Sequence, residues 1–473
     1  MARPFAHPAR VGFIRLPMLL VALAMFVASQ LLAPAARAQS LLRDAETEAF
    51  FREIGTPLME AAGLDPRAVS IGLVGAPEIN AFATLGQNVY FYSGLLVAAD
   101  DVLEVQGVLA HELGHVAGGH AVRFNEGAGP ATNISLLSLV VGAALIAAGA
   151  GDAGMAALMA GQQAAQGKFL AFSREQESRT DQAGAQYLEK AGVDGTGMIS
   201  FFKELQGQEY RLAIPQDNSY NRTHPLSGER ITALEFAVKK SPYWGKGADP
   251  ALQARYQRIR AKLIGYVSEP KDTLKAYPLS DTTPPARVAR AYAFHKLAES
   301  DKAIAELDAL LAKSPADPYL LEMKGQVLLE SGRVDESLTP LRQAVAAPGR
   351  EPLIEAMLGH ALVQSGERSG DPHIFAEAEK VLRTALARDD DNPFAWLQLE
   401  TVYERRGDKP RLALATAERL TLTGGSPMAA LNAATVASQG LEQGTPEWIR
   451  AQDIMQLSRN RAEDDKRDKK ARR

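Results

Sequence analysis

Two histidines and a glutamate near residue 111 have the spacing of a metal-dependent hydrolase. His111, Glu112 and His115 form the pattern H-E-x-x-H. On a helix the two histidines lie one turn apart and can bind the same metal ion. Two neutral imidazoles suit Zn²⁺, and a catalytic zinc needs a third protein ligand and an open position for water. Glu112 could accept a proton from that water, so the motif predicts metal-assisted hydrolysis.

The helix that would position this motif covers residues 102–120, where apolar residues recur at helical spacing. The pattern predicts an amphipathic helix with one buried face. H-E-x-x-H also occurs by chance on ordinary helices, so the motif alone does not establish a metal site. Three of the eight histidines fall between His111 and His120, and the flanking residues are small and apolar. Both features favour a buried metal site.

A later acidic segment offers the third ligand. Ser173 and Gln176 have the spacing of a capping box, which predicts a helix from there to about Lys190. Glu177 and Asp181 share one face of that helix. Such a pair usually marks a solvated face. Beside H-E-x-x-H, however, it can provide a metal ligand and a carboxylate that orients a liganding histidine. The result would be a gluzincin-type site.

A histidine could instead be the third ligand, as in metzincins, which have H-E-x-x-H-x-x-G-x-x-H. Gly118 fits that pattern, but its last position is Ala121, and His120 is one residue short. We therefore reject the metzincin interpretation. His120 is expected to point away from the face of His111 and His115 and to have a structural or supporting role.

Two further site candidates follow a polar loop. His224 precedes a proline at a predicted junction between loop and helix, where a histidine can also be purely structural. Arg230 lies six residues later on the following helix and could face the same cleft. Its cationic side chain could then stabilise a developing oxyanion.

Residues 69–92 predict a small antiparallel sheet. Asn80, Ala81 and Phe82 lie in one of its candidate strands. A sheet edge near a metal helix offers hydrogen-bonding groups to an extended peptide substrate, so these residues are candidates for a substrate edge strand. The alternative, a sheet that serves only for packing, remains open.

Composition and the first residues indicate export. The net charge of −4 gives no sign of nucleic-acid binding, and the absence of cysteine leaves only histidines and carboxylates as zinc ligands. Arginines precede an apolar run, residues 16–32, and the small-x-small site Ala36-Arg37-Ala38. This order predicts a cleaved signal peptide, with Gln39 as the first mature residue. An uncleaved membrane anchor is the alternative.

Residues 134–150 form a second apolar run, rich in glycine and alanine. A helix that crosses a bilayer needs about 20 apolar residues, so this run is at the lower limit. Packed helices inside the protein are the favoured interpretation. Peripheral contact with a membrane, or insertion into it, is the alternative.

The second half of the chain contains a repeat. Prolines recur every 34 residues, with one interval of 41, at Pro284, Pro318, Pro352, Pro393 and Pro427. Glycines that would form the turn of each helical pair follow by fourteen residues at Gly332, Gly366 and Gly407. The longer interval indicates an insertion near residues 367–373. This period predicts tetratricopeptide repeats, whose concave surface suits peptides and partner proteins.

The predicted fold class is therefore α+β, mostly α. A zincin-like metallopeptidase domain with a small sheet precedes an all-α solenoid of tetratricopeptide repeats. The expected boundaries are a signal peptide at 1–38, a peptidase domain at 39–270, a linker at 271–283, the repeats at 284–458 and a charged, frayed or disordered tail at 459–473.

Taken together, the motifs resemble the HtpX-like zinc metallopeptidases. The resemblance rests on His111-Glu-Leu-Gly-His115, on Ser173-Arg-x-x-Glu177-x-x-x-Asp181 and on Thr223-His224-Pro225 with Arg230, and it extends to Asn80-Ala-Phe-Ala83. It covers roughly residues 70–235. Thr180 departs slightly from the family, which usually has alanine there.

The resemblance implies that His111, His115 and Glu177 bind one Zn²⁺, that Glu112 is the catalytic base and that Asp181 orients a ligand. His224 would occupy the open zinc position in a latent state. It also implies a periplasmic endopeptidase, peripheral to the outer membrane, that acts on polypeptides in outer-membrane protein quality control. The repeats would then recruit substrates or the assembly machinery. The alternatives are a chaperone or adaptor with a latent metal site and a membrane-embedded protease.

Overall fold

The computed structural model describes residues 40–471 with four gaps, at 148–149, 212–223, 225–226 and 350. Residues from Leu41 onward form one compact unit. The expected signal peptide at 1–38 and the expected first mature residue, Gln39, lie outside the described residues.

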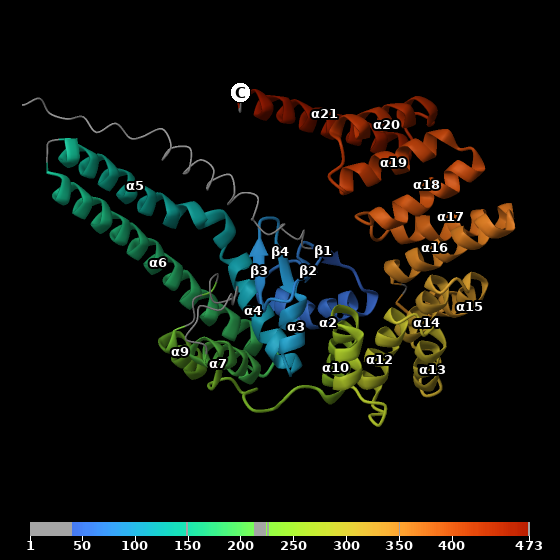
Figure 1. The fold of residues 1–473 in the computed structure, drawn as a ribbon, viewed down its shortest axis with the longest axis horizontal. Coiled ribbons are helices and arrows are strands. Elements are labelled where there is room, and N and C mark those ends of the chain that lie inside the picture. The colour runs from blue at the N-terminus through green and yellow to red at the C-terminus, as the bar shows by residue number, and fades with distance from the viewer. Residues whose placement is uncertain (1–39, 148–149, 212–223, 225–226, 350, 472–473) are drawn as a thin grey trace, which may run out of the picture. The chain divides into compact units, whose positions relative to one another are not determined.

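The first half of the described chain builds a small sheet with helices around it (Figure 1). One apolar core joins α2, the sheet, α4, α7 and α10. The elements of this half are β1 (Ser40–Leu42), α2 (Ala45–Ala61), β2 (Ser70–Gly75), β3 (Ala81–Thr84), β4 (Asn88–Tyr92), α3 (Ser93–Ala98), α4 (Val102–Ala117), α5 (His120–Ala147), α6 (Gly151–Lys190), α7 (Thr196–Arg211), α9 (Gly228–Val238) and α10 (Pro250–Val267).

The sheet has the strand order β1-β2-β4-β3 and is mixed. β3 pairs with β4 antiparallel, with Phe82 opposite Tyr90, because the two strands follow one another through a tight turn. β2 pairs with the other side of β4 in parallel, with Leu73 opposite Phe91. The prediction of an antiparallel sheet was therefore wrong for β2. Its chain crosses past β4 before β3 begins, so β2 and β4 run in the same direction.

Helix α4 bears the H-E-x-x-H motif and lies at the centre of the peptidase domain. Asp101 caps its first turn by accepting a hydrogen bond from the Leu103 N–H at 2.7 Å. Every residue from Val102 to Gly114 is buried, so the prediction of one buried face was wrong. Other helices cover the remaining faces of α4. A methyl group on Gly107 would lie 2.6 Å from the Cα atom of Met198 in α7.

Helix α6 supplies the acidic pair and runs without interruption from Gly151 to Lys190. Ser173 and Gln176 therefore do not begin a helix, contrary to the capping-box prediction. The preceding turns are rich in alanine and glutamine, which favour a helix, so local propensity outweighs the capping signal. The predicted end is right, because Ala191 is the C-cap and Gly192 has a φ of +74°.

The hairpin of α5 and the first half of α6 projects beyond the rest of the peptidase domain (Figure 1). Within it, residues 128–146 are long and apolar enough to cross a membrane, yet only 11 % of this segment is buried. The described residues of 134–150 are therefore not buried, contrary to one form of the expectation, although α5 packs against α6 as the other form has it. The two helices cover each other on one side only.

The second half of the chain is a stack of helix pairs (Figure 1). The first helix of each pair begins at one of the repeating prolines, at a position where the missing N–H has no cost. After α11 (Pro270–Ala276), the pairs are α12 (Pro284–Lys296) with α13 (Ser300–Leu311), α14 (Pro318–Glu330) with α15 (Val334–Ala346), α16 (Pro352–Ser369) with α17 (Pro372–Leu386), α18 (Pro393–Arg406) with α19 (Lys409–Leu422), and α20 (Pro427–Gly440) with α21 (Pro446–Ala471).

The glycines of the repeats met two of three expectations. Gly332 and Gly407 have φ values of +81° and +68° at the turns within their pairs. Gly366 instead lies inside α16, and Gly370 caps that helix with a φ of +71°. The insertion therefore lengthens α16 and moves its turn four residues along the chain.

Two boundary segments are more ordered than predicted. Helix α11 occupies the first part of the expected linker at 271–283, and Thr273 in it is fully buried. Arg290 of α12 holds the second part, because its Nη1 atom donates hydrogen bonds to the carbonyls of Pro278 and Asp281 at 2.8 and 2.7 Å. The expected tail at 459–473 continues α21 as far as Ala471. The fold class itself, α+β and mostly α with a helical-repeat tail, is confirmed.

Candidate metal centre

His111 and His115 meet inside the peptidase domain as their spacing predicts. Both extend from α4, and their Nε2 atoms lie 3.2 Å apart. His111 is fully buried, and its ring packs edge-on against Phe202 of α7 at a centroid distance of 5.7 Å. The neighbouring helices therefore fix the orientation of the first histidine.

Glu177 of α6 joins the two histidines. Its Oε2 atom lies 3.3 Å from His111 Nε2, and its Oε1 atom lies 3.3 Å from His115 Nε2. Small residues let the two helices approach this closely. A methyl group on Gly114 of α4 would lie 2.9 Å from the Cγ2 atom of Thr180 in α6.

His224 is the fourth member of the cluster. Its Nδ1 atom lies 3.3 Å from His111 Nε2 and 3.2 Å from Glu177 Oε1. One ligand atom from each of the four residues lies within 4.8 Å of all the others, so together they could hold a metal ion. The sequence marked His224 as a candidate, but only the fold brings it beside residues 113 positions earlier in the chain.

The separations suit a tetrahedral ion. Zinc bonds of about 2.0–2.1 Å place tetrahedral ligand atoms about 3.3 Å apart, and five contacts within the cluster, made through one or the other oxygen of Glu177, are 3.2–3.3 Å long. Three nitrogens and one carboxylate oxygen are also a donor set that zinc accepts. The described residues therefore fit a zinc ion in both geometry and chemistry.

Glu112 lies beside the cluster with its carboxylate fully buried. Neither of its oxygens has a hydrogen-bond partner among the described residues, and Oε1 lies 3.5 Å from His224 Nε2. A buried carboxylate without partners is costly, which suits a group that receives a hydrogen bond from a small bound molecule such as water. This position agrees with the predicted proton acceptor.

Asp181 and Arg230 form a layer behind the ligands. Asp181 Oδ1 lies 3.0 Å from His111 Nδ1, so the carboxylate can fix the orientation of the imidazole. Arg230 donates two hydrogen bonds of 2.8 Å to Asp181 and forms a 3.1 Å ion pair with Glu177. Arg230 was expected to face an oxyanion in the cleft. In this structure both carboxylates engage its guanidinium, and a role at the oxyanion stays a prediction.

The start of α9 explains where Arg230 points. The Oγ atom of Ser227 caps this helix by accepting a hydrogen bond from the Arg230 N–H at 3.2 Å. Arg230 therefore lies in the first turn, where only 7 % of its surface is exposed. The spacing of six residues between His224 and Arg230 indicates that Arg230 lies near the start of the helix. It does not indicate which side chains the guanidinium contacts.

The electrostatics of the cluster place a proton on its first histidine when no metal is bound. Burial lowers the pKa of His111, but hydrogen bonds and charge interactions with Asp181 and Glu177 raise it to about 10 overall. Burial and the neighbouring charge of His111 lower the pKa of His115. Burial raises the pKa of Glu177, but the charge of His224 and hydrogen bonds with the histidines hold it well below its ordinary value.

His120 is nearer to the cluster than the sequence suggested. Its Nδ1 atom lies 2.9 Å from the Nδ1 atom of His115 and 3.3 Å from Thr180 Oγ1. The expectation that it points away from the histidines was wrong, because α4 ends at Ala117 and Gly119, with a φ of +64°, turns the chain back. His120 thus supports the Nδ1 atom of His115. The contact of Thr180 with His120 was not predicted from the sequence.

The candidate substrate strand lies at an edge of the sheet. In the described part of the chain, β3 pairs only with β4. Asn80 and Ala81 are buried, and the Asn80 carbonyl accepts a hydrogen bond from the Tyr92 N–H at 2.9 Å. The ring of Phe82 packs on Tyr90 at 5.4 Å. The edge position agrees with the expectation, and the role in binding substrate stays a prediction.

Comparison with known proteins supports the interpretation of the cluster. Residues 16–238 match the model of peptidase family M48. The protein is a metalloprotease. The three histidines and the glutamate are a group that could hold the metal of such an enzyme.

The metalloprotease has relatives that share both of its halves. It is 25 % identical to the beta-barrel assembly-enhancing protease of Yersinia pestis over 81 % of this chain and 78 % of the relative. It is 24 % identical to the protein of the same name from Escherichia coli, again over 81 % of this chain. Metalloprotease YcaL of Escherichia coli is 32 % identical over 32 % of this chain and 56 % of its own length. The chain therefore resembles the beta-barrel assembly-enhancing proteases.

Proposed function

We propose that this metalloprotease is a zinc-dependent endopeptidase that hydrolyses peptide bonds of misfolded or stalled proteins. The single observation behind the proposal is the mutual proximity of His111, His115, Glu177 and His224 beside the carboxylate of Glu112, which has no hydrogen-bond partner among the described residues. In the proposed enzyme, His111, His115 and Glu177 hold the zinc. When bound, the ion supplies a Lewis acid and an acidified water.

The other residues of the site have supporting roles in this proposal. Glu112 accepts the proton of the attacking water and passes it to the leaving amine. Asp181 orients His111 by accepting a hydrogen bond at Nδ1. Arg230 is a positioning residue, because it fixes Asp181 and Glu177 through hydrogen bonds and an ion pair.

We also propose that His224 holds the enzyme in a latent state. A catalytic zinc needs an open fourth position, and His224 is the fourth residue of the cluster. Activity would then require that this side chain leaves the cluster. Displacement of His224 would thereby couple binding of a substrate or partner to opening of the site.

The proposed cellular role follows from the relatives. They are named for enhancing the assembly of beta-barrels, and they align with this chain across the peptidase and the repeats. We propose that the protein acts in the periplasm, after cleavage of residues 1–38, in quality control of outer-membrane proteins. The repeats would recruit polypeptide substrates or the assembly machinery through their concave surface.

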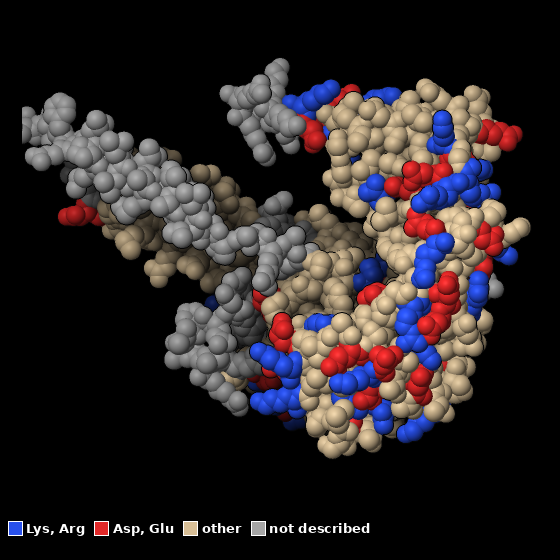
Figure 2. Space-filling model, turned by 45° about the vertical axis from the view of Figure 1, so that its right-hand side comes forward, with Lys and Arg blue, Asp and Glu red and all other residues tan. Residues whose placement is uncertain are grey.

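Peripheral contact with a membrane is part of this proposal, with the hairpin of α5 and α6 as the contact. Between Gly127 and Gly167 the only charged residue is Asp152. The hairpin surface that Figure 2 shows is almost entirely uncharged, whereas the repeat helices bear many acidic and basic side chains. Exposed fractions of 55–66 % on residues 136, 137, 139 and 140 are unusual in water.

The interior of the hairpin has the close packing that helices use in lipid. A methyl group on Gly142 would lie 2.5 Å from the Cγ atom of Leu158, and one on Gly154 would lie 2.7 Å from the Gly142 carbonyl oxygen. Small residues that let backbones approach drive helix association where the hydrophobic effect cannot. At 1.5 Å per residue, residues 128–146 extend about 28 Å, close to the bilayer core of about 30 Å.

A chaperone or adaptor with a permanently latent site is the alternative function. The buried position of His224 in the cluster favours this alternative, whereas the carboxylate of Glu112, which lacks a hydrogen-bond partner among the described residues, favours the enzyme. Casein cleavage by the purified, zinc-loaded full chain decides between them. With Glu112→Gln we expect cleavage to fall by about 10²- to 10⁴-fold while zinc content stays unchanged. Equal cleavage by the wild type and Glu112→Gln would reject the peptidase mechanism.

A further inference from the structure

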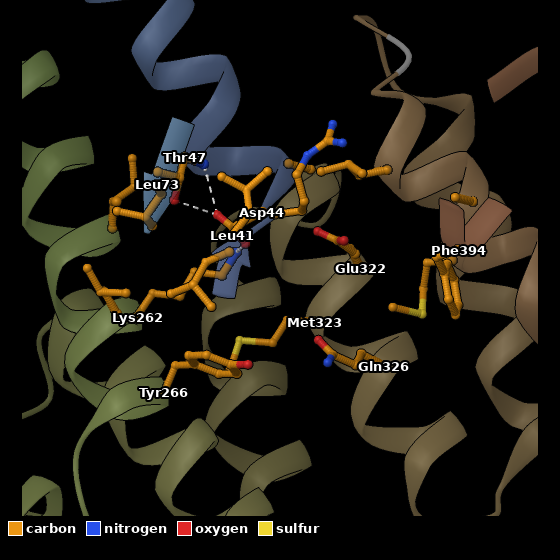
Figure 3. Close-up of a pocket in the computed structure, with 18 of the residues that line it drawn as sticks. Leu41, Asp44, Thr47, Leu73, Lys262, Tyr266, Glu322, Met323, Gln326 and Phe394 are labelled. Atoms are coloured by element: carbon orange, nitrogen blue, oxygen red, sulfur yellow. Dashed lines mark hydrogen bonds and ion pairs between the residues drawn. The ribbon is translucent and has the colours of Figure 1, made fainter. Parts of the chain in front are cut away.

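A pocket of about 390 Å³ lies away from the metal cluster, where the peptidase domain meets the repeats (Figure 3). Its walls come from the segment before α2, from α10 and from the repeat helices α12, α14, α16 and α18. All of these repeat helices are the first of their pair, so the pocket opens on the face of the stack that first helices share. Helical repeats commonly bind their ligands on extended concave surfaces.

Most of the lining is apolar and partly open to solvent. Leu41, Tyr266 and Phe394 are 53 %, 51 % and 39 % exposed, and Met323 lies between them at the base of the pocket (Figure 3). A volume of about 390 Å³ is at the lower end of ligand pockets, which span about 300–1,000 Å³. The pocket therefore has room for one or two side chains of a longer ligand.

One acidic side chain faces this apolar space. Glu322 of α14 points into the pocket in Figure 3 and has no hydrogen bond or ion pair within the described part of the chain. The neighbouring cations already have carboxylate partners. Lys262 pairs with Asp44, and Arg258 pairs with Glu46 at 2.5 Å. Glu322 is thus the acidic group of the pocket that is left without a counterion.

The other cations near the pocket are also engaged. Arg43 forms ion pairs with Glu48 at 2.5 Å and with Asp389 at 3.1 Å. Arg52 pairs with Glu351 at 2.6 Å. The described residues around the pocket therefore offer Glu322 no unpaired positive charge, and a ligand could supply one.

We propose that this pocket binds a lysine or arginine side chain of an extended polypeptide, with Glu322 as its counterion and the adjacent apolar side chains of the polypeptide against Leu41, Met323 and Phe394. Charge complementarity selects the basic residue, and the apolar walls select its neighbours. The proposal rests on the proposed function only in taking a polypeptide as the ligand. It adds a recognition site remote from the metal cluster.

The state of the unliganded pocket makes this binding sensitive to pH. Burial raises the pKa of Glu322 to about 8, the charge of Lys262 lowers it, and Asp44, Glu46 and Glu351 raise it. The Tyr292 hydroxyl, with its own pKa raised by burial, lines the same space and stays neutral. Near pH 7 the free pocket therefore holds a proton, and a basic side chain displaces it when it binds. Affinity should increase from pH 6 to 8 and then level off.

The test uses the full chain with Glu112→Gln, so that a bound peptide is not cleaved. The probe is a fluorescein-labelled peptide Ala-Leu-Leu-Arg-Leu-Leu-Ala with an amidated end, and the comparison peptide has glutamine in place of arginine. Fluorescence anisotropy should show at least about tenfold tighter binding of the arginine peptide. A second substitution, Glu322→Gln, should remove this preference and leave binding of the glutamine peptide unchanged.

The matched control is Glu336→Gln, because Glu336 is an exposed acid of the next helix, paired with Arg333 at 2.5 Å. It should bind both peptides as the parent does. Glu322→Gln reproduces the shape and neutral charge of the protonated side chain, so it should fold, and its thermal unfolding temperature tests this. Equal affinity for the two peptides, or a preference for arginine that survives Glu322→Gln, would overturn the proposal. Because no cleavage is measured, either failure leaves the proposed peptidase function untouched.

Calorimetry in phosphate and Tris buffers provides an independent readout. The binding enthalpy of the arginine peptide at pH 7 should differ between these buffers by the amount that release of up to one proton predicts. It should not differ for Glu322→Gln. Competition by vesicles of phosphatidylethanolamine, with no preference for arginine, would assign the pocket to lipid and reject the peptide.

Discussion

The Nδ1 atom of His224 lies 3.3 Å from the Nε2 atom of His111, although 113 positions separate them in the chain. A loop residue thus completes a cluster that α4 and α6 begin. Three ligands would suffice for a catalytic ion, and a fourth protein ligand takes the place of water. This one contact links the proposed chemistry of the site to its regulation.

Substitution of His224 with alanine should activate the enzyme. Removing the imidazole frees the fourth position, so we expect kcat/KM for casein to increase by at least about threefold as the fraction of open sites increases. His111, His115 and Glu177 should still retain one zinc per chain. Atomic absorption and casein cleavage measure the two quantities together. A variant that keeps its zinc but cleaves more slowly than the wild type would show that His224 assists catalysis.

Substitution of Arg230 with glutamine should weaken metal binding. It removes two hydrogen bonds to Asp181 and the ion pair with Glu177, so both carboxylates lose their positioning. Loss of such outer partners typically lowers metal affinity by about 10- to 100-fold. Zinc competition with a chromophoric chelator measures the change. Lys203→Gln, which removes an exposed ion pair with Glu235, is the control and should keep the affinity of the wild type.

Metal binding should release protons, and its pH dependence follows from His111. Its pKa of about 10 means that the metal-free imidazole is protonated at neutral pH. Zinc needs the neutral form, so binding at pH 7.5 should release about one proton. The apparent zinc affinity should therefore rise as the pH increases from 6 to 9. Calorimetry in buffers of different ionisation enthalpy counts the protons, and zero proton release would contradict the assigned charge state.

Substitution of Gly107 with alanine should destabilise the peptidase domain. The added methyl group would lie 2.6 Å from the Cα atom and 2.8 Å from the backbone nitrogen of Met198, so α4 and α7 would have to separate. Overpacking of this kind costs about 1–3 kcal/mol, which a lowered thermal unfolding temperature would report. Gly167→Ala, at a helical position with nothing within 4 Å, should leave that temperature unchanged or higher.

Charges on the α5–α6 hairpin should abolish membrane contact. Leu137 and Val140 are 65 % and 66 % exposed, and aspartates there would oppose burial in lipid. The double variant Leu137→Asp and Val140→Asp should lose flotation with vesicles of phosphatidylethanolamine and phosphatidylglycerol. The control is Leu279→Asp, which changes an equally exposed leucine of the linker segment. If the wild type itself does not float, the proposed membrane contact of the hairpin is rejected.

Features that depend on a few neighbouring residues could be predicted from the sequence. The distance from His111 to His115 is set by one helical turn, so H-E-x-x-H fixes how their imidazoles meet wherever the helix lies. Each proline of the 34-residue series starts a helix, because its fixed φ and missing N–H suit only the first turn there. Glu177 and Asp181 follow the same local rule on α6.

The tertiary structure decided every feature that depends on contacts between distant segments. It turned Arg230 toward Asp181 and Glu177, because a buried guanidinium needs carboxylates as its counterions. It paired β2 with β4 in parallel, since the hairpin to β3 already occupied the other edge of β4. It also left Glu322 facing an apolar pocket without a counterion. Helical spacing determines neighbours within one turn, whereas packing between elements selects the partner of each charge.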